Sequence, residues 1–264
     1  MGILNLTPDS FHDGGAWDKP SAALGQAERM LDEGADVLDL GAQSTRPGAE
    51  VLGAEAEWQR LEPVLVALQR DHPDAILSVD TFHAEVARRA LAEGADIIND
   101  VSGGDADPDM WNVVAQARVP YVLMHMQGTP ATMQDNPTYD DVVHDVVTHL
   151  QRRVHAAYQA GVADVIADVG FGFGKTVKHN YALLDALDQF QELQCPILAG
   201  VSRKSMIQRV LDTNSQHALN GTTALHAWAL DRGAHLLRAH DVAEAKEVVA
   251  LHRALVQSRI LDAP

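Results

Sequence analysis

The sequence predicts an α/β protein built as a single (β/α)8 TIM barrel over residues 1–264. Three observations favour this fold. A glycine-containing motif, which first occurs as Glu33-Gly34-Ala35-Asp36, recurs between an amphipathic stretch and a short apolar run. Apolar runs and stretches of helical spacing alternate eight times along the chain. The 264 residues then give about 33 per unit, the size expected for one barrel strand with its helix.

The elements follow in order from these signals. A glycine after an amphipathic stretch is a helix-stop signal, and the runs that follow are short and rich in branched residues, as strands are. A second set of runs has a proline just upstream, at Pro73, Pro120 or Pro196. Strands are expected at 3–6, 37–40, 76–79, 97–99, 121–124, 165–167, 197–201 and 236–239. Helices are expected between them, because apolar residues such as Leu61, Leu65 and Leu68 share one helical face. A doubly wound open sheet is the alternative.

Composition argues against several classes of protein. The net charge of -17 argues against a general nucleic-acid or anionic-membrane surface, since both bind clustered Lys and Arg. The one cysteine, Cys195, cannot form an internal disulfide, which favours a reducing, cytoplasmic location. Every apolar run is interrupted well short of membrane-spanning length. An anionic ligand would therefore need a local basic site.

In a barrel, chemistry lies just past the C-terminal ends of the strands. Each expected strand has a polar residue there: Asn5, Asp39, Asp80, Asn99 with Asp100, His125, Asp168, Ser202 to Ser205, and Arg238 with His240. Asp and Asn also favour turns, so a single position carries little weight. Two segments, 7–20 and 41–53, are longer than usual strand-to-helix connections, which favours binding or lid functions.

Three groups of residues suggest specific chemistry. The motif Gly170 to Thr176 lacks the glycine spacing of a phosphate loop and instead predicts a compact turn that presents Phe173, although a purely structural turn is the alternative. Asp80, Asn99 and Asp168 suit the N–H edge of a heterocycle, or a metal ion. Lys204 and Arg238 follow the last two strands, where barrels often bind phosphate.

Together these residues give the chain a resemblance to the dihydropteroate synthase family. The matching segments occur in the family's order across nearly the whole chain: Met1 to Asn5, Thr7 to Phe11, Ser44 to Gly48, Ser78 to Thr81, Ile98 to Gly103, Asp168 to Lys175, Ser202 to Ser205, and Arg238 to Asp241. The resemblance implies that para-aminobenzoate condenses with 6-hydroxymethyl-7,8-dihydropterin diphosphate to give 7,8-dihydropteroate and diphosphate.

The resemblance also implies roles for individual residues. The pterin would be held by Asp80, Asn99, Met124, Asp168, Phe173 and Lys204. The diphosphate would meet Asn5, Thr45, Arg238 and His240, with Asn5 also a ligand of Mg2+. Para-aminobenzoate would contact Phe11, Thr45, Arg46, Pro47, Phe173 and Ser205. Lys204, Arg238 and His240 would act in catalysis, and no side chain is expected to be a covalent nucleophile.

Two sites, which comprise three residues, depart from the family's pattern, and two other functions stay open. Val169 replaces a usual proline, and Ala42-Gln43 replaces a usual Gly-Glu, which puts the geometry of two loops in question. The alternatives are a methyltetrahydrofolate-dependent corrinoid methyltransferase and a poorly active pterin-binding paralogue. The resemblance further implies sulfonamide inhibition and a homodimer, through late helices such as residues 219–230.

Overall fold

Eight parallel strands form the centre of the molecule, and each pairs with its neighbours in sequence. The computed structural model describes residues 1–7, 19–43, 51–129 and 132–261. The strands are β1 (Gly2–Asn5), β2 (Val37–Gly41), β3 (Ile76–Asp80), β4 (Ile97–Asp100), β5 (Pro120–Met124), β6 (Asp164–Asp168), β7 (Ile197–Ala199) and β8 (Leu236–Leu237). A parallel bridge between Gly2 and Ala239 joins the last segment to the first, so the sheet closes. The predicted TIM barrel is confirmed.

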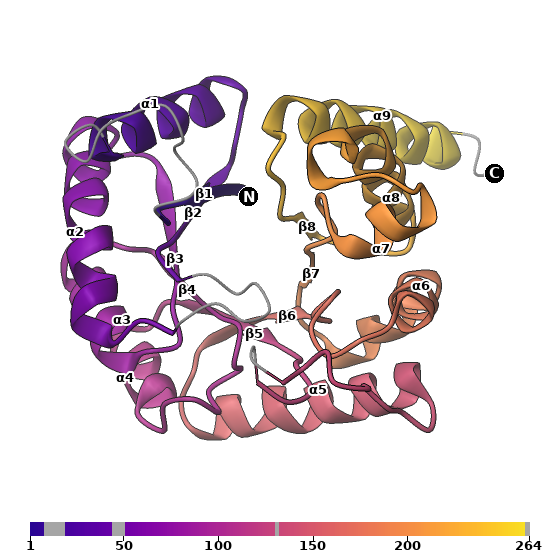
Figure 1. Ribbon diagram of the computed structural model, residues 1–264, viewed down its shortest axis with the longest axis horizontal. Coiled ribbons are helices and arrows are strands. Elements are labelled where there is room, and N and C mark those ends of the chain that lie inside the picture. Colours follow the sequence, from indigo (N-terminus) through magenta and orange to yellow (C-terminus); the bar gives the residue numbers. More distant parts are fainter. Residues whose placement is uncertain (8–18, 44–50, 130–131, 262–264) are drawn as a thin grey trace.

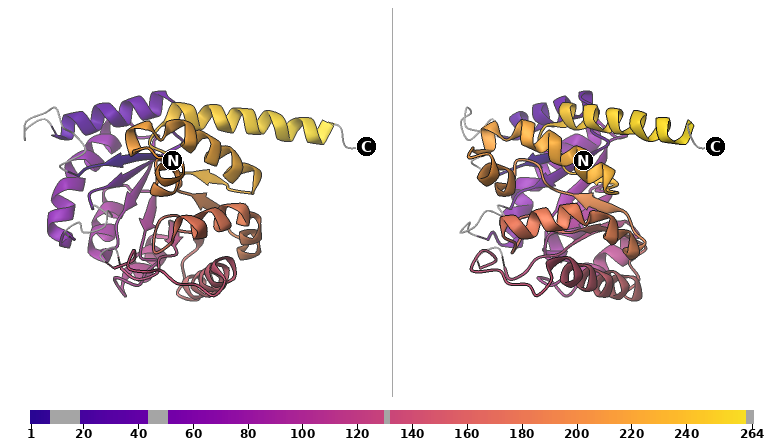
Figure 2. Two further views of the ribbon diagram at one scale, coloured as in Figure 1. Left: turned by 45° about the vertical axis from the view of Figure 1, so that its right-hand side comes forward. Right: turned by 90° about the vertical axis from the view of Figure 1, so that its right-hand side faces the viewer.

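Helices surround the strands on all sides (Figure 1). They are α1 (Lys19–Asp32), α2 (Ala54–Asp71), α3 (Ala84–Ala92), α4 (Met110–Ala117), α5 (Val142–Gln159), α6 (Val177–Asp185), α7 (Ser205–Val210), α8 (Leu219–Asp231) and α9 (Val242–Leu261), with 3-10 helices η2 (Leu187–Leu193) and η3 (Ser215–His217). The end of α9 extends past the barrel (Figure 2). Within the described ranges, no helix is both long and apolar enough to cross a membrane.

Local sequence explains where these helices end and which face they bury. The glycines of the recurrent joints, Gly34, Gly94, Gly161 and Gly233, all have φ between 90° and 96°, a left-handed conformation that stops a helix. The expected apolar face of α2 is buried, including Leu61, Val64, Leu65 and Leu68. These side chains pack on the outward faces of the strands in one continuous apolar layer.

The barrel interior holds a smaller apolar cluster of its own. Val37, Ile97, Val122, Ile166 and Leu198 form it, one from each of five strands. Successive residues of a strand point to opposite faces, so residues two positions further along also face the barrel axis. The cluster therefore forms a floor, and the next inward residues lie above it at the mouth of the barrel.

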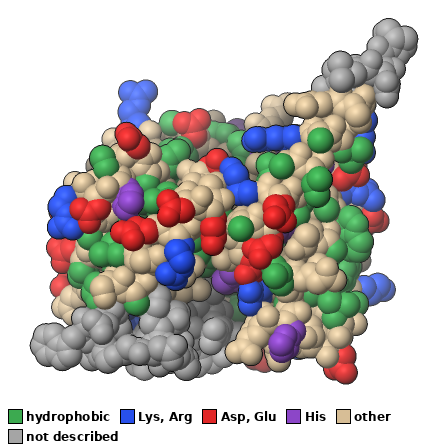
Figure 3. Space-filling view, turned by 90° about the horizontal axis from the view of Figure 1, so that it is seen from above, with side chains coloured by type: hydrophobic (Ala, Val, Ile, Leu, Met, Phe, Trp, Pro, Cys, Tyr) green, Lys and Arg blue, Asp and Glu red, His purple; other side chains and the backbone are tan. Residues whose placement is uncertain are grey.

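The face that carries α1 and α9 shows no concentration of one charge (Figure 3), and the cysteine lies inside the molecule. On the face that carries α1 and α9, acidic, basic and hydrophobic side chains are interspersed (Figure 3). Cys195 is buried and free.

Candidate active site

A cavity of ≈ 670 Å³ opens at the C-terminal ends of the strands, directly above the apolar floor. Nine of the residues that the sequence predicts for the site line it: Asn5, Asp80, Asn99, Met124, Asp168, Phe173, Lys204, Arg238 and His240. They come from seven strands or the segments directly after them. The fold thus brings together side chains that are far apart in the sequence.

Strand alternation explains which polar residues reach the cavity. Asn99 follows Ile97 by two residues, and Met124 follows Val122, so both continue an inward row that begins in the floor. Asp100 and His125 have the opposite parity. The Asp100 carboxylate points outward and accepts a bond from the Tyr121 hydroxyl at 2.7 Å. Asp100 and His125 therefore lie at the ends of strands, as the sequence predicted, but their side chains do not line the cavity.

Asp39 lies beneath the cavity and links three of its walls, a role that the sequence analysis did not assign. The side chain is fully buried. It accepts bonds from Ser78 Oγ at 2.6 Å, Asn99 Nδ2 at 3.0 Å and Arg238 Nε at 2.7 Å. Because Asp39 follows the floor residue Val37 by two positions, the inward row was the signal that could have identified it.

Arg238 joins two carboxylates across the barrel. Its guanidinium meets Asp39 and, through Nη2, Asp80 Oδ2 at 3.0 Å. Burial raises the pKa of Asp80 to about 7, the Arg238 charge opposes that shift, and the Asp39 charge adds to it. Asp80 is therefore a carboxyl group whose charge changes near neutral pH.

The opposite wall pairs Asp168 with Lys204. Burial raises the pKa of Asp168, while the positive charge of Lys204 and the Gly170 N–H oppose the rise. Burial lowers the pKa of Lys204 to about 8, and Asp168 opposes that shift. The Lys204 ammonium lies 4.7 Å from the centre of the Phe173 ring and donates to the carbonyl of Phe171. A flat ligand with N–H donors could stack on the Phe173 ring here and donate to the oxygens of the Asp168 carboxylate.

The segments after β7 and β8 form the basic side of the mouth. Arg203 also lines the cavity, and its guanidinium forms a two-point ion pair with Asp241, at 2.8 and 2.6 Å. His240 bonds Ser202 Oγ through Nδ1 at 2.9 Å, and burial together with Arg238 lowers the pKa of His240 to about 4. A neutral imidazole still offers one N–H to an anion.

Ser205 lies in a neighbouring cavity. It is exposed at the start of α7 and lines a hollow of ≈ 620 Å³ that shares Phe173 and Lys204 with the first cavity. The two hollows therefore meet at the Phe173 ring. Four further predicted residues, Phe11, Thr45, Arg46 and Pro47, lie outside the described residues.

Both departures from the family's pattern are accommodated by local contacts. Val169 is fully buried in the outer apolar layer. The Gln43 amide donates to Leu52 O at 2.9 Å and to Glu57 Oε2 at 2.8 Å, and its oxygen accepts from Leu52 N at 3.1 Å. These bonds join Gln43 to Leu52, the residue at the other end of segment 44–51.

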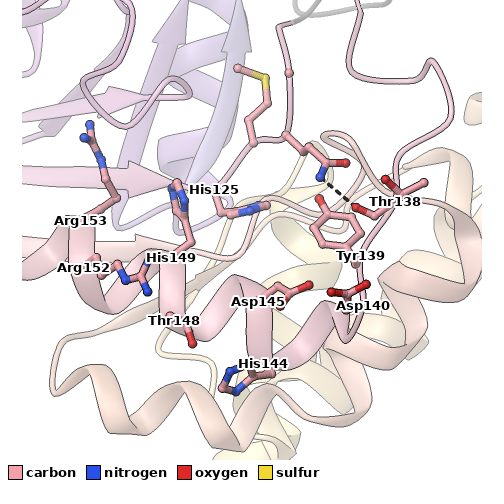
Figure 4. A pocket seen from close by; sticks show the side chains of 13 residues that line it. His125, Thr138, Tyr139, Asp140, His144, Asp145, Thr148, His149, Arg152 and Arg153 are labelled. Atoms are coloured by element: carbon pink, nitrogen blue, oxygen red, sulfur yellow. Dashed lines mark hydrogen bonds between the residues drawn. The ribbon is translucent and has the colours of Figure 1, made fainter.

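A separate hollow of ≈ 830 Å³ lies beside α5, outside the barrel mouth. Its wall combines Arg152 and Arg153 with Asp140 and Asp145 (Figure 4). His125 stands at its inner end, beside the His149 ring at 4.8 Å between ring centres. Mixed charges without a shared direction give this hollow no defined ligand chemistry.

Comparison with known proteins agrees with the geometry. Residues 1–240 match the profile of the family described as pterin binding enzyme. The dihydropteroate synthase of Haemophilus influenzae is 43% identical over 256 residues, which cover 96% of this chain and 92% of that protein.

Two solved structures have the same fold. Xanthomonas albilineans dihydropteroate synthase with 4-aminobenzoic acid superposes with a TM-score of 0.91 at 43% identity, covering 100% of this chain and 93% of that one. The same enzyme in complex with 7,8-dihydropteroate gives 0.87 at 40% identity, covering 100% and 94%. The chain belongs to the dihydropteroate synthase family of pterin-binding enzymes.

Proposed function

We propose that the chain catalyses the condensation of 6-hydroxymethyl-7,8-dihydropterin diphosphate with para-aminobenzoate in folate biosynthesis. The observation that carries the proposal is a cavity at the barrel mouth in which carboxyl groups, an amide and an aromatic ring face a basic wall. Membership of the dihydropteroate synthase family supports the same reaction. The relative crystallised with 7,8-dihydropteroate supports the identity of the product.

The pterin ring would occupy the part of the cavity between Asp80 and Asp168. Asn99 is fixed by its bond to Asp39, so its carbonyl oxygen remains available to the ligand. Carboxylates accept parallel N–H bonds, as an aminopyrimidine edge presents them. Met124 and Phe173 line the cavity as apolar walls, and Lys204 places a positive charge beside the Phe173 ring.

The diphosphate would face Arg238 and His240. In the reaction, the bond between the pterin methylene and the diphosphate oxygen breaks, and the electron pair leaves with the diphosphate. The aromatic amine of para-aminobenzoate forms the new C–N bond and then loses a proton to solvent. Cationic side chains accelerate this step because they stabilise charge that develops on the leaving group.

Para-aminobenzoate would enter from the neighbouring hollow. Phe173 borders both hollows, so its ring can contact the benzoate while the carboxylate reaches Ser205. Phe11, Thr45, Arg46 and Pro47 complete the proposed contacts. Sulfonamides resemble para-aminobenzoate, and we propose that they compete for this hollow.

We propose Mg2+ as the metal, with Asn5 as a ligand. Among the described residues, no group of three or more His, Cys, Asp or Glu side chains is placed to hold a metal ion. A single oxygen ligand fits Mg2+, which keeps several waters and takes its other ligands from substrate phosphates. When bound, the ion would neutralise charge on the diphosphate.

The alternatives make different demands of the cavity. A corrinoid methyltransferase would use the pterin side and would have no diphosphate for the basic segments after β7 and β8, around Lys204 and Arg238. A poorly active paralogue would bind pterin without turnover. Both are separated from the proposal by activity measurements.

The deciding experiment measures diphosphate release from dihydropterin diphosphate in the presence of Mg2+, with and without para-aminobenzoate. We expect release that depends on para-aminobenzoate and equals the dihydropteroate formed. Lys204→Ala should lose turnover while keeping its fold by circular dichroism, whereas the exposed Lys178→Ala should keep both. Absence of amine-dependent release would refute the proposed reaction.

Two further proposals concern the context of the enzyme. Cys195 is a free buried thiol, which is compatible with the cytoplasm that we propose as its location. We also propose a homodimer through α8, where Trp228 is 55% exposed. Sedimentation velocity should give a dimer for the parent and a monomer for Trp228→Glu, and a monomeric parent would refute this interface.

A further inference from the structure

Lys175 is a buried lysine that the proposed reaction does not use. Only 3% of it is exposed. Its ammonium nitrogen lies 2.9 Å from the Gly170 carbonyl oxygen and 3.0 Å from that of Phe173. It also lies 2.9 Å from His125 Nδ1 and 3.3 Å from the His125 carbonyl oxygen. Lys175 therefore connects the segment after β5 with the turn after β6.

Each of the four hydrogen-bond partners of this nitrogen can accept, so the arrangement suits the N–H donors of a lysine side chain. The backbone carbonyls replace the water that burial removes. Burial lowers the pKa of Lys175, and the negative charge of Asp168 opposes the shift. Burial and Lys175 lower the pKa of His125 to about 2, so the ring is neutral and its Nδ1 can accept.

The path of the turn explains why its carbonyls converge on one point. Gly170 has φ +71°, and a Cβ on it would lie 1.9 Å from the carbonyl oxygen of His125. Gly174 has φ +63°, and a Cβ there would lie 2.5 Å from the carbonyl oxygen of Gln127. The turn thus runs against the backbone after β5 more closely than any side chain allows.

The same turn fixes two cavity residues. The Gly170 N–H donates to Asp168 Oδ1 at 2.8 Å, and the Phe173 N–H donates to Gly170 O at 3.1 Å. Lys175 Nζ bonds the carbonyls of both Gly170 and Phe173, and so closes the turn at each end. On the other side, Lys204 donates to Phe171 O.

We propose that Lys175, held by His125, is a positioning residue that sets Asp168 and the Phe173 ring for pterin binding without touching the pterin. The inference rests on the pterin site of the proposed function. It gives the motif Gly170 to Thr176 a role in binding beyond that of a structural turn. It also makes His125 part of the site's support, although the side chain points away from the cavity.

The test measures the affinity of the folded protein for 6-hydroxymethylpterin by fluorescence titration, at a temperature well below each variant's Tm. Lys175→Met removes the donors and keeps the length of the side chain. We expect it to bind the pterin about tenfold more weakly, or worse, because the turn carbonyls lose their common partner. Lys178→Met, at an exposed lysine three residues along, should bind as the parent does.

A second pair of variants keeps the test decisive if Lys175→Met does not fold. His125→Asn places an amide oxygen near the position of Nδ1, whereas His125→Leu removes the acceptor. We expect His125→Asn to retain parental affinity and His125→Leu to lose several-fold, with both melting cooperatively. Equal affinities for these two variants, or parental affinity in folded Lys175→Met, would overturn the inference. A parent that does not bind the pterin would instead refute the proposed function.

Discussion

Gln43 illustrates how much one amide can determine at the residue scale. Both of its N–H groups and its oxygen are used, two of them on the backbone of Leu52 and one on the buried Glu57 carboxylate. Burial raises the pKa of Glu57, and the Gln43 bond opposes that rise. The position therefore requires a group that donates and accepts at once.

The isosteric change Gln43→Glu tests this requirement. A glutamate cannot donate to Leu52 O, and it would place a second carboxylate within bonding distance of Glu57. We expect a loss of about 1–3 kcal/mol of stability near neutral pH, because buried acceptors lose their donors. The loss should shrink in acid, since protonation of one carboxyl restores a donor. Urea unfolding at pH 5 and pH 8 measures both effects.

The control for this change is Glu57→Gln. Its amide oxygen still accepts from Gln43, so most of the network should survive. If Gln43→Glu unfolds at the same urea concentration as the parent at both pH values, the network contributes nothing to stability.

Sequence alone predicted the residues that line the cavity better than those that hold them. Asp80, Asn99 and Asp168 lie in inward rows at the ends of strands, so a barrel hypothesis was enough to place them. The bonds of Asp39 and Lys175 depend on how strands and turns meet in space, which no local pattern encodes. The four acceptors around Lys175 converge only because two glycines adopt positive φ.

At the scale of elements, α5 begins at a capped terminus. The Asp141 carboxylate accepts from the backbone N–H groups of Val143 at 3.0 Å and His144 at 3.1 Å. These groups have no partner inside the helix, so a side-chain acceptor stabilises the first turn. The helix in turn packs its buried face on β5 and β6.

Asp141→Ala should therefore lower the free energy of unfolding by about 1 kcal/mol. Denaturant unfolding checks the value, and pterin affinity should not change, because the cap lies outside the cavity. Asp140→Ala, at the exposed neighbouring carboxylate, should change stability by less than about 0.5 kcal/mol. An equal effect of the two substitutions would mean that the cap bonds do not stabilise α5.

Strand limits were predicted to within a few residues, and the largest differences have a physical cause. β7 was expected to continue to Val201 but ends at Ala199. β8 was expected to reach Ala239, yet its ladder ends at Leu237 and Ala239 bonds to the first strand instead. The apolar pattern of a sequence indicates which residues are buried, not which ones form strand hydrogen bonds. Val201 and Ala239 are buried although both lie beyond the ends of their strands.

At the scale of the whole molecule, buried titratable groups make stability depend on pH in two opposite directions. Burial raises the pKa of Asp80 to about 7 and lowers that of His226 to about 4. A raised carboxyl pKa adds stability at low pH that is lost as pH rises through the folded value. A lowered imidazole pKa costs stability in acid and ceases to do so above the unfolded value near 6.5.

The two opposite effects of pH on stability can be separated by measuring the Tm of Asp80→Asn and of His226→Gln between pH 5 and pH 8. Relative to the parent, Asp80→Asn should gain in Tm as pH rises, because the parent must ionise a buried carboxyl. His226→Gln should show the opposite trend, with its advantage confined to the acid side. Parallel curves for parent and variants would show that neither group titrates differently on unfolding.

The single cysteine of the chain has a practical use. Cys195 is 7% exposed, so thiol reagents applied to the folded protein find no accessible reactive group among the described residues. The variant Arg209→Cys would carry the only reachable thiol among the described residues, at an exposed position that lines the hollow proposed for para-aminobenzoate but has no proposed contact with it. One spectroscopic label at that point would then report ligand arrival in an otherwise unmodified protein.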